Sequence, residues 1–245
     1  MRSEIQRFQS LDELSVTSAE YICQIAQQAV AEHGHFTMAL SGGNTPRTLY
    51  ELLAQEPYIH TIPWSETHLF WGDERAVPVE HPDSNAAMVS QALIKHIPIP
   101  LHNVYRIPTE GNTPEEAAAH YESLLHEMLP VFASSPHIPG IPVFDLILLG
   151  LGKDGHTASL FPDSPVLNES SRWVSATPVP SMQPPVRRIT LTFPVLNAAK
   201  VVLFLVSGQE KHEIVNTIIE HPDQARSLYP AAHVRPEGIL RWFIV

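Results

Sequence analysis

The sequence predicts an α/β fold with a Rossmann-like, doubly wound, mostly parallel sheet and helices on both faces. Three observations predict it. Short apolar runs alternate with segments of helical spacing along the 245 residues. Residues 143–149 are almost continuously apolar, which is typical of a parallel strand buried on both faces. Polar, glycine-rich residues follow directly after several expected strands, where parallel sheets carry their binding loops.

The first half of the chain supplies a helix, two strands and the start of a second helix. Residues 18–33 have helical spacing and stop at Gly34, a residue type common just past a helix end. Residues 36–40 and 67–71 are expected strands. Between them lies Thr45, which is followed by a proline and is therefore the expected N-cap of the second helix.

The second half continues the alternation. Thr113 and Glu116 match a capping box, the start of a helix that we expect to run to about residue 129. Ser207 and Glu210 match a second capping box. The remaining expected strands are residues 143–149, 189–193, 201–206 and 239–245.

We expect residues 1–245 to form a single domain. The 23 prolines gather in connectors, and the strands on either side of those connectors have the same character. A domain boundary near residues 136–142 is the alternative. Repeats of 20–50 residues, which would indicate a repeat architecture, are absent from the sequence.

Composition narrows the class of protein. The formal net charge of −11 argues against nucleic-acid binding, so a site for an anionic ligand has to be locally basic. Apolar runs stay far below the ~18 residues of a membrane span, and residues 1–7 lack the apolar core of a secretion signal. Cys23 is the single cysteine, which fits a reducing compartment. We expect a soluble, cytoplasmic protein.

A glycine-rich segment follows the expected strand at 36–40. It reads Ser41-Gly42-Gly43-Asn44-Thr45. Glycines at this place let backbone N–H groups approach an anion, and the helix start adds the positive end of its dipole. The alternative is a tight turn with an N-cap and no ligand. A Gly-Lys-Ser/Thr ending does not follow, so ATP is not implied.

Charged residues follow the expected strand at 67–71. The first of them are Asp73, Glu74 and Arg75, and Ser84 and Asn85 come soon after. An arginine offers two parallel hydrogen bonds to a phosphate or carboxylate, and an aspartate orients a base or binds sugar hydroxyls. A solvated turn at a strand end is an equally good interpretation of this segment alone.

The segment after residues 143–149 contains Gly150, Gly152 and Gly155, which match the dinucleotide pattern G-x-G-x-x-G. Asp154 argues against that interpretation, because its carboxylate would lie where the pyrophosphate binds. A proline also follows too early for the long helix that the pattern requires. We expect instead that Asp154 and His156 supply the carboxylate and imidazole of a general base.

Basic residues later in the chain complete the candidate site. Arg187 and Arg188 begin an expected strand, and Lys211 lies in the first turn of an expected helix. Together with Arg75 they provide the local positive field that the whole chain lacks. Each of them alone is equally explained as a surface charge.

Other chemistries lack their motifs. The histidines show no H-x-x-x-H or H-E-x-x-H spacing, and with one cysteine a zinc site is not expected. The G-x-S-x-G turn of acyl-serine hydrolases is also absent from the sequence. We therefore expect an enzyme without a metal or a redox cofactor.

Taken in order, these segments are similar to those of the glucosamine-6-phosphate isomerase/6-phosphogluconolactonase family, and within it to the lactonases. The resemblance covers nearly the whole chain. It rests also on three further segments, which read Thr157-Ala158-Ser159-Leu160-Phe161-Pro162, Arg188-Ile189-Thr190-Leu191-Thr192 and Ser207-Gly208-Gln209-Glu210-Lys211. The chain departs from the family pattern at Asp163, where relatives usually have glycine, which puts the local turn in doubt.

The resemblance implies hydrolysis of 6-phospho-D-glucono-1,5-lactone in the oxidative pentose phosphate pathway, without a cofactor. A small phosphorylated sugar lactone would then be the partner. The family's base falls on His156, and its acidic and arginine positions fall on Asp73 and Arg75. Phosphate binding falls on the segment 41–45 and on Lys211.

Two other functions stay open at this point. A glucosamine-6-phosphate deaminase or another sugar-phosphate isomerase would share the fold, but those relatives carry an acidic residue where this chain has residues 157–162. A non-catalytic sugar-phosphate sensor is the second alternative. It would need a DNA-binding module, for which the net charge gives no support.

Overall fold

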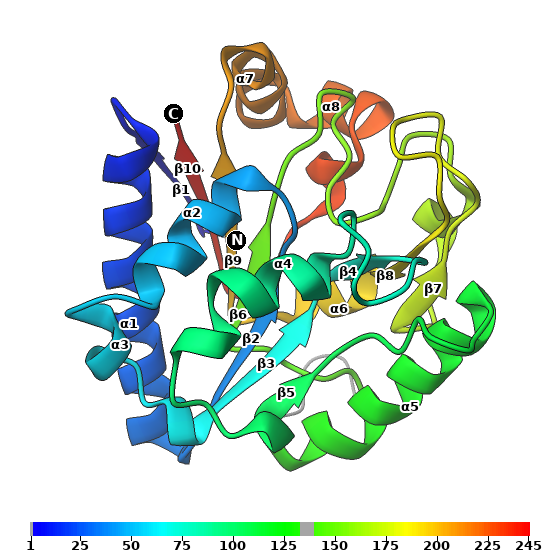
Figure 1. The fold of residues 1–245 in the computed structure, drawn as a ribbon. Coiled ribbons are helices and arrows are strands. Elements are labelled where there is room, and N and C mark those ends of the chain that lie inside the picture. Colours follow the sequence, from blue (N-terminus) through cyan, green and yellow to red (C-terminus); the bar gives the residue numbers. More distant parts are fainter. Residues whose placement is uncertain (1, 133–139) are drawn as a thin grey trace.

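The structure, a computed structural model, describes residues 2–132 and 140–245. In this part of the chain, seven strands form one parallel sheet in the order β1-β10-β9-β6-β2-β3-β5 (Figure 1). In that order they are Arg2–Arg7 (β1), Ile239–Ile244 (β10), Val201–Val206 (β9), Leu146–Leu149 (β6), Phe36–Leu40 (β2), Thr67–Trp71 (β3) and Val104–Tyr105 (β5).

Helices cover both faces of this sheet, as the sequence predicts (Figure 1). The helices are Leu11–His33 (α1), Asn44–Leu53 (α2), Tyr58–Thr61 (α3), Asn85–Ala92 (α4), Pro114–Phe132 (α5), Phe193–Ala198 (α6), His212–Glu220 (α7) and Pro222–Leu228 (α8). Helix α1 packs against α2, and α2 against α4. The connections between the parallel strands are right-handed crossovers. Up to β5 they run in one direction along the sheet, which places α1, α2 and α4 on one face. After β5 they run in the opposite direction, which places α5 and α6 on the other face.

A small antiparallel sheet stands beside the main one. Its strands pair in the order β4-β8-β7. They are Asp73–Arg75 (β4), Arg188–Leu191 (β8) and Val174–Ala176 (β7). The sequence predicts a loop at 73–75 and a strand at 189–193, and both expectations are partly wrong. The charged run forms a strand because it pairs with β8, and Phe193 already begins α6.

Several expected elements are confirmed. Strands β2, β3 and β9 have the predicted bounds. Helix α1 ends at Gly34, whose φ of 84° is the left-handed conformation that favours glycine, but the helix begins earlier than predicted, with Ser10 as its N-cap. The capping box at the start of α5 is also present, since Thr113 N donates to Glu116 Oε2 at 2.8 Å.

Two expected caps are wrong. Helix α2 has Gly43 as its N-cap, and η5 (Gln209–Lys211), a short 3₁₀ turn, has Gly208; neither has a side-chain cap. The hydroxyls of Thr45 and Ser207 instead contact each other at 2.6 Å. This hydrogen bond joins the first turn of α2 to the loop that follows β9.

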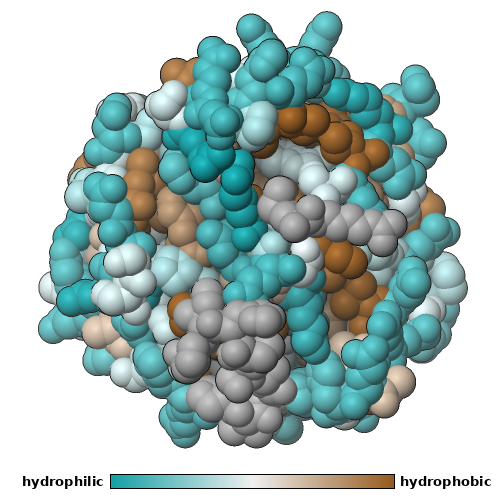
Figure 2. Space-filling view, turned by 180° about the vertical axis from the view of Figure 1, so that it is seen from behind, coloured by the Kyte–Doolittle hydropathy of each residue, from teal (hydrophilic) through white to brown (hydrophobic). Residues whose placement is uncertain are grey.

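The core consists of apolar side chains between the sheet and its helices. Trp242 of β10 and Phe204 of β9 stack with their ring centroids 3.9 Å apart. Figure 2, a view from behind, shows a mainly hydrophilic face on which apolar residues form separate patches. Of the helices in residues 2–132 and 140–245, none is both long and apolar enough to cross a membrane. Most of the alternative domain boundary at 136–142 lies outside the described residues.

Candidate active site

A cleft of about 240 Å³ opens beyond the carboxyl ends of the parallel strands. It lies where the strand order reverses, between the loops that follow β2 and β6, which is the usual ligand position in such sheets. All the predicted site residues except Asp154 line it, namely Ser41, Gly42, Gly43, Asn44, Thr45, Asp73, Arg75, His156, Arg188 and Lys211. The fold therefore brings together segments that are far apart in the sequence.

The loop after β2 presents the start of α2 to the cleft. Gly43 has a φ of 104°, which favours glycine, and α2 begins at the next residue. The first N–H groups of a helix have no partner within the helix and carry the positive end of its dipole. The walls of the cleft include Gly43, Asn44 and Thr45. This wall is suited to an anion such as a phosphate.

His156, on the wall of the cleft, forms a pair with Asp154 behind it. His156 Nδ1 lies 2.5 Å from Asp154 Oδ1, and the His156 backbone N–H donates to the same oxygen at 3.2 Å. Burial opposes ionisation of Asp154, but the hydrogen bonds and the charge of His156 outweigh it, so that the pKa of this carboxyl lies below its usual value. A carboxylate at Nδ1 holds the proton there and leaves Nε2 as the basic nitrogen.

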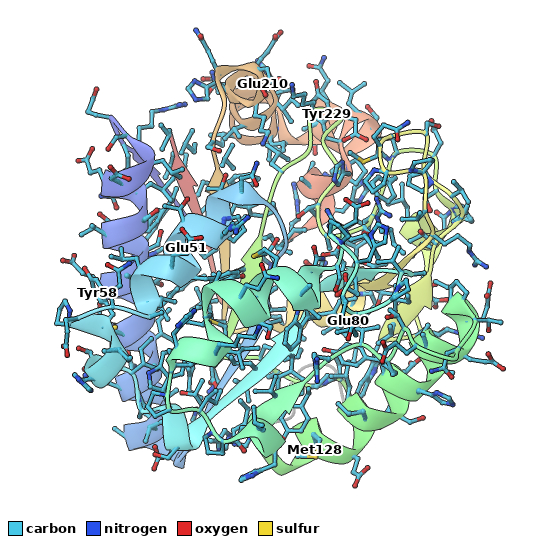
Figure 3. All side chains as sticks on the ribbon, viewed as in Figure 1. Glu51, Tyr58, Glu80, Met128, Glu210 and Tyr229 are labelled. Atoms are coloured by element: carbon cyan, nitrogen blue, oxygen red, sulfur yellow. The ribbon has the colours of Figure 1, made fainter. Side chains whose placement is uncertain are left out.

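The glycines of this segment make room for the pair. A Cβ at Gly152 would lie 2.0 Å from His156 Nδ1, and a Cβ at Gly155 would lie 2.4 Å from the ring of Tyr229. Gly155 also has a φ of 78°. The G-x-G-x-x-G match thus reflects close packing around His156. Tyr229, labelled in Figure 3, comes from the far C-terminal part of the chain and lies at the end of the molecule where α7 and α8 are found.

Asp73 is held from two sides inside the cleft. Ser159 Oγ donates to Asp73 Oδ2 at 2.5 Å, and Asn85 Nδ2 donates to Asp73 Oδ1 at 3.3 Å. All three residues are buried. The neighbouring Glu74 does not line the cleft. Its carboxylate accepts hydrogen bonds from the backbone N–H groups at the start of α4, at 2.7 Å from both Asn85 N and Ala86 N.

Two arginines reach the cleft from the small sheet. Arg75 and Arg188 occupy paired positions of β4 and β8. Arg188 donates to the carbonyls of Val186 at 2.7 Å and Pro184 at 3.0 Å. Burial, followed by the nearby charge of Arg75, lowers the pKa of Arg188, although an arginine remains protonated at any ordinary pH.

Lys211 supplies a third cation. It lies half-buried in η5, next to the glycine loop. Burial lowers the pKa of Lys211, and the neighbouring Glu210 partly opposes this. Glu210 Oε1 lies 3.3 Å from Lys153 Nζ of the loop after β6, and this ion pair connects η5 to the segment that contains His156. Figure 3 shows Glu210 at the same end of the molecule as Tyr229.

Sequence reasoning missed part of this cleft. Its walls also include Asn85, Ser159, Phe161, Met182 and Gln183. Asn85, Ser159 and Phe161 lie in segments on which the family resemblance rests. Their place in those segments is the sequence signal that could have identified them as site residues. Met182 and Gln183 belong to a proline-rich connector without any local signal of function.

Two backbone features lie beside the site. Ala158, on the wall of the cleft, has a φ of 46°, and Asp163 has a φ of 60°. Both residues therefore have the left-handed backbone conformation that suits glycine. Aspartate tolerates this conformation better than most residues do. A residue other than glycine in this conformation carries local strain.

Metal-ligating side chains do not gather in this site. Within residues 2–132 and 140–245, no group of three or more histidine, cysteine, aspartate or glutamate residues could hold a metal ion.

Residues 9–242 match the model of the family described as glucosamine-6-phosphate isomerases/6-phosphogluconolactonase. The chain belongs to this family. A 6-phosphogluconolactonase from Synechocystis sp. is 43% identical over 89% of this chain and 85% of its own length. A probable chloroplastic 6-phosphogluconolactonase from Oryza sativa is 39% identical, over 96% of this chain and 72% of its own.

Solved structures of family members have the same fold. The 6-phosphogluconolactonase of Trypanosoma cruzi superimposes with a TM-score of 0.87 at 32% identity, over 99% of this chain and 94% of its own. That of Thermotoga maritima gives a TM-score of 0.82 at 30% identity, over 99% of both chains. A monomeric glucosamine-6-phosphate deaminase, at 18% identity and a TM-score of 0.79 over 98% of this chain and 97% of its own, shares the fold alone.

Proposed function

We propose that this protein hydrolyses 6-phospho-D-glucono-1,5-lactone to 6-phospho-D-gluconate, the lactone step of the oxidative pentose phosphate pathway. One observation carries the proposal furthest. His156, with Nδ1 held by Asp154, lines a cleft that has Asp73 and three cations on its walls. A base for water and a basic site for a phosphate therefore lie within one cleft of small-molecule size. The 6-phosphogluconolactonases among its relatives support the same reaction.

His156 acts as the general base in this mechanism. Its Nε2 takes a proton from a water molecule as the water oxygen attacks C1 of the lactone. The carbonyl oxygen then becomes negatively charged in a tetrahedral intermediate. When this intermediate collapses, the bond between C1 and the ring oxygen breaks. The protonated imidazole returns its proton to that ring oxygen, which leaves a hydroxyl group and a carboxylic acid, and the acid then loses its remaining proton to solvent to give the carboxylate. The Asp154 carboxylate stabilises the imidazolium while it exists.

The remaining residues bind and orient the substrate. The start of α2, with Ser41 to Thr45, forms the phosphate site together with Arg188 and Lys211. Asp73 accepts hydrogen bonds from sugar hydroxyls, and Arg75 stabilises negative charge that develops at C1 or resides on the phosphate. Because every one of these groups is supplied by the protein, the reaction needs no metal or redox cofactor, and exhaustive chelation should leave the rate unchanged.

A glucosamine-6-phosphate deaminase is the rival within the same family. The rival reaction opens the sugar ring with the help of an acid in the segment after His156. In this chain Ala158, Ser159 and Phe161 are the residues of that segment that line the cleft, and none of them is acidic. Asp163 lines a different cavity. The geometry therefore favours lactone hydrolysis.

One set of assays tests the proposal. The purified protein should consume the phosphorylated lactone well above the spontaneous rate and release no ammonia from glucosamine-6-phosphate. Tight binding of 6-phosphogluconate without lactone turnover would overturn it in favour of a sensor, and ammonia release would establish the deaminase.

We place the enzyme in the cytoplasm, since Cys23 is a free, buried thiol. The net charge of −11 supports no role on nucleic acid.

A further inference from the structure

Asn85 joins two walls of the cleft that come from different parts of the chain. It is 2% exposed and is the first residue of α4. Its Nδ2 donates to the backbone carbonyl of Asp73 at 2.9 Å and to the Asp73 carboxylate at 3.3 Å. Its Oδ1 is buried and has no hydrogen-bond partner among the described residues. A fully buried amide that leaves its acceptor unsatisfied needs an explanation beyond folding.

The glycine loop gives the first part of that explanation. A Cβ built on Gly42 would lie 1.9 Å from Asn85 Oδ1, and the nearest three atoms to it all belong to Asn85. The amide therefore rests directly over the backbone of Gly42. This close approach is possible only because residue 42 has no side chain.

The backbone around Asn85 gives the second part. Glu74 accepts hydrogen bonds from Asn85 N and Ala86 N at 2.7 Å, and from Ser84 Oγ at 3.2 Å. These bonds fix the start of α4 against β4, so the direction of the Asn85 side chain is set by its backbone. The amide lies between the Asp73 carboxylate and the glycine loop.

We propose that Asn85 is a positioning residue that sets the place of the Asp73 carboxylate relative to the glycine loop. It acts through Asp73 and Gly42, the two residues that its amide contacts. This inference rests on the proposed lactonase function, in which Asp73 contacts the sugar and the loop contacts the phosphate. A small displacement of one wall would separate the two ends of the substrate from their partners, and misplacement of about 1 Å can cost about 10²-fold in rate.

A double-mutant cycle tests the contact with Gly42. Gly42→Ala should lower kcat/KM by about 10- to 100-fold, because its Cβ would displace the amide. In an Asn85→Ala background the same Cβ has room, so Gly42→Ala should then cost little more. Additive losses would overturn the proposal, since they would mean that Gly42 and Asn85 act independently. Thermal unfolding of each variant checks that it is folded.

A pH profile separates positioning from a role in folding alone. Asn85→Asp keeps the shape but places a second carboxylate against Asp73, and two adjacent carboxylates share a proton at a raised pKa. While that proton is present, the introduced carboxyl group can donate as the amide does. The ratio of variant to unmodified kcat/KM should therefore be highest at acid pH and fall as pH rises, whereas Asn168→Asp, the same change at an exposed site, should give a flat ratio near one.

The outcomes are distinct. A flat ratio for Asn85→Asp across the pH range, with the variant folded, would overturn the positioning role and leave the lactonase function standing. If the unmodified protein does not hydrolyse the lactone at all, the proposed function itself fails. Then 6-phosphogluconate binding, measured across the same double-mutant cycle, still decides whether Asn85 and Gly42 act as a unit.

Discussion

Arg75 and Arg188 face each other across the antiparallel pairing of β4 and β8. Like charges at directly opposed positions of two strands destabilise a sheet. Neither arginine forms an ion pair with a carboxylate among the described residues. They donate instead to backbone carbonyls, Arg75 to that of Asp83 and Arg188 to those of Pro184 and Val186. Both arginines line the cleft, and we propose that they bind an anionic group of the substrate.

The arginine pair gives the first prediction. Arg75→Gln should weaken binding of 6-phosphogluconate by about 10- to 100-fold, since a hydrogen bond to a charged group contributes about 1.5–3 kcal/mol. The free protein should unfold at an unchanged or slightly higher temperature, because the repulsion with Arg188 is removed. Thermal unfolding with and without 6-phosphogluconate measures both effects. Arg226→Gln, a change at an exposed arginine, is the control. A variant destabilised without ligand but normal in affinity would contradict the prediction.

The second prediction concerns the base. His156→Asn removes the basic nitrogen but keeps a polar side chain, so the loss should fall on kcat while the dissociation constant of 6-phosphogluconate changes little. General-base catalysis typically contributes about 10²–10⁴-fold. The assay has to subtract spontaneous hydrolysis of the lactone. His120→Asn, at an exposed histidine, is the matched control. Near-normal kcat in His156→Asn would disprove the assignment and leave a water bound to a carboxylate as the next candidate.

The third prediction concerns Asp154. Asp154→Asn replaces the acceptor at His156 Nδ1 by a group that can donate, which favours the wrong tautomer. We expect kcat to fall by about 10-fold or more, because part of the general-base contribution of His156 is lost. The affinity for the product should be unchanged. If kcat and affinity fall together, Asp154 supports the loop and not the base.

Asp154 also links stability to pH. The pKa of this carboxyl is lower in the folded than in the unfolded protein, so ionised Asp154 stabilises the fold above its unfolded pKa. That contribution is lost as pH falls through the folded pKa. The stability difference between the unmodified protein and Asp154→Asn should therefore shrink in acid, which chemical denaturation at several pH values would measure. Because the carboxylate is partly exposed, the effect should be small.

Five of the seven strands of the main sheet could be predicted because their signals are local, whereas β1 and β5 were not predicted. Residues 36–40, 67–71 and 201–206 are apolar runs of strand length, and they form β2, β3 and β9 with the expected bounds. The position of the site followed from the same rule, since ligands bind beyond the carboxyl ends of parallel strands. In the small sheet, β8 was predicted in part, at 189–193, but β4 could not be predicted, because it becomes a strand only by pairing with β8, more than a hundred residues away.

The contacts inside the site also divide into local ones, which the sequence predicts, and long-range ones, which it does not. Asp154 and His156 are two residues apart, so their pairing was visible in the sequence. Thr45 and Ser207 were assigned to helix caps because each precedes a helix, yet the fold brings their hydroxyls together. Asn85 looked like a residue near a charged turn. Its contacts with Asp73 and Gly42 depend on the meeting of β4, the start of α4 and the loop after β2, for which a single sequence carries no local signal.

The last prediction uses the pKa of Lys211, which burial places below that of an ordinary lysine. If Lys211 holds the phosphate, affinity for 6-phosphogluconate should be constant near neutral pH and fall as rising pH deprotonates the lysine. This loss should begin at a lower pH than it would with an exposed lysine. The ligand does not cause it, because a phosphate monoester is fully ionised well above its second pKa of about 6. Lys211→Arg should move the loss to higher pH, since arginine stays protonated, and Lys211→Ala should weaken binding at every pH.

Lys95→Ala, a change at an exposed lysine, is the control and should have no effect on affinity. Unphosphorylated gluconate should show no such pH dependence. Calorimetric titration across the pH range makes the measurement. The same alkaline loss in the unmodified protein and in Lys211→Arg would contradict the prediction, since it would show that deprotonation of a group other than Lys211 weakens the binding.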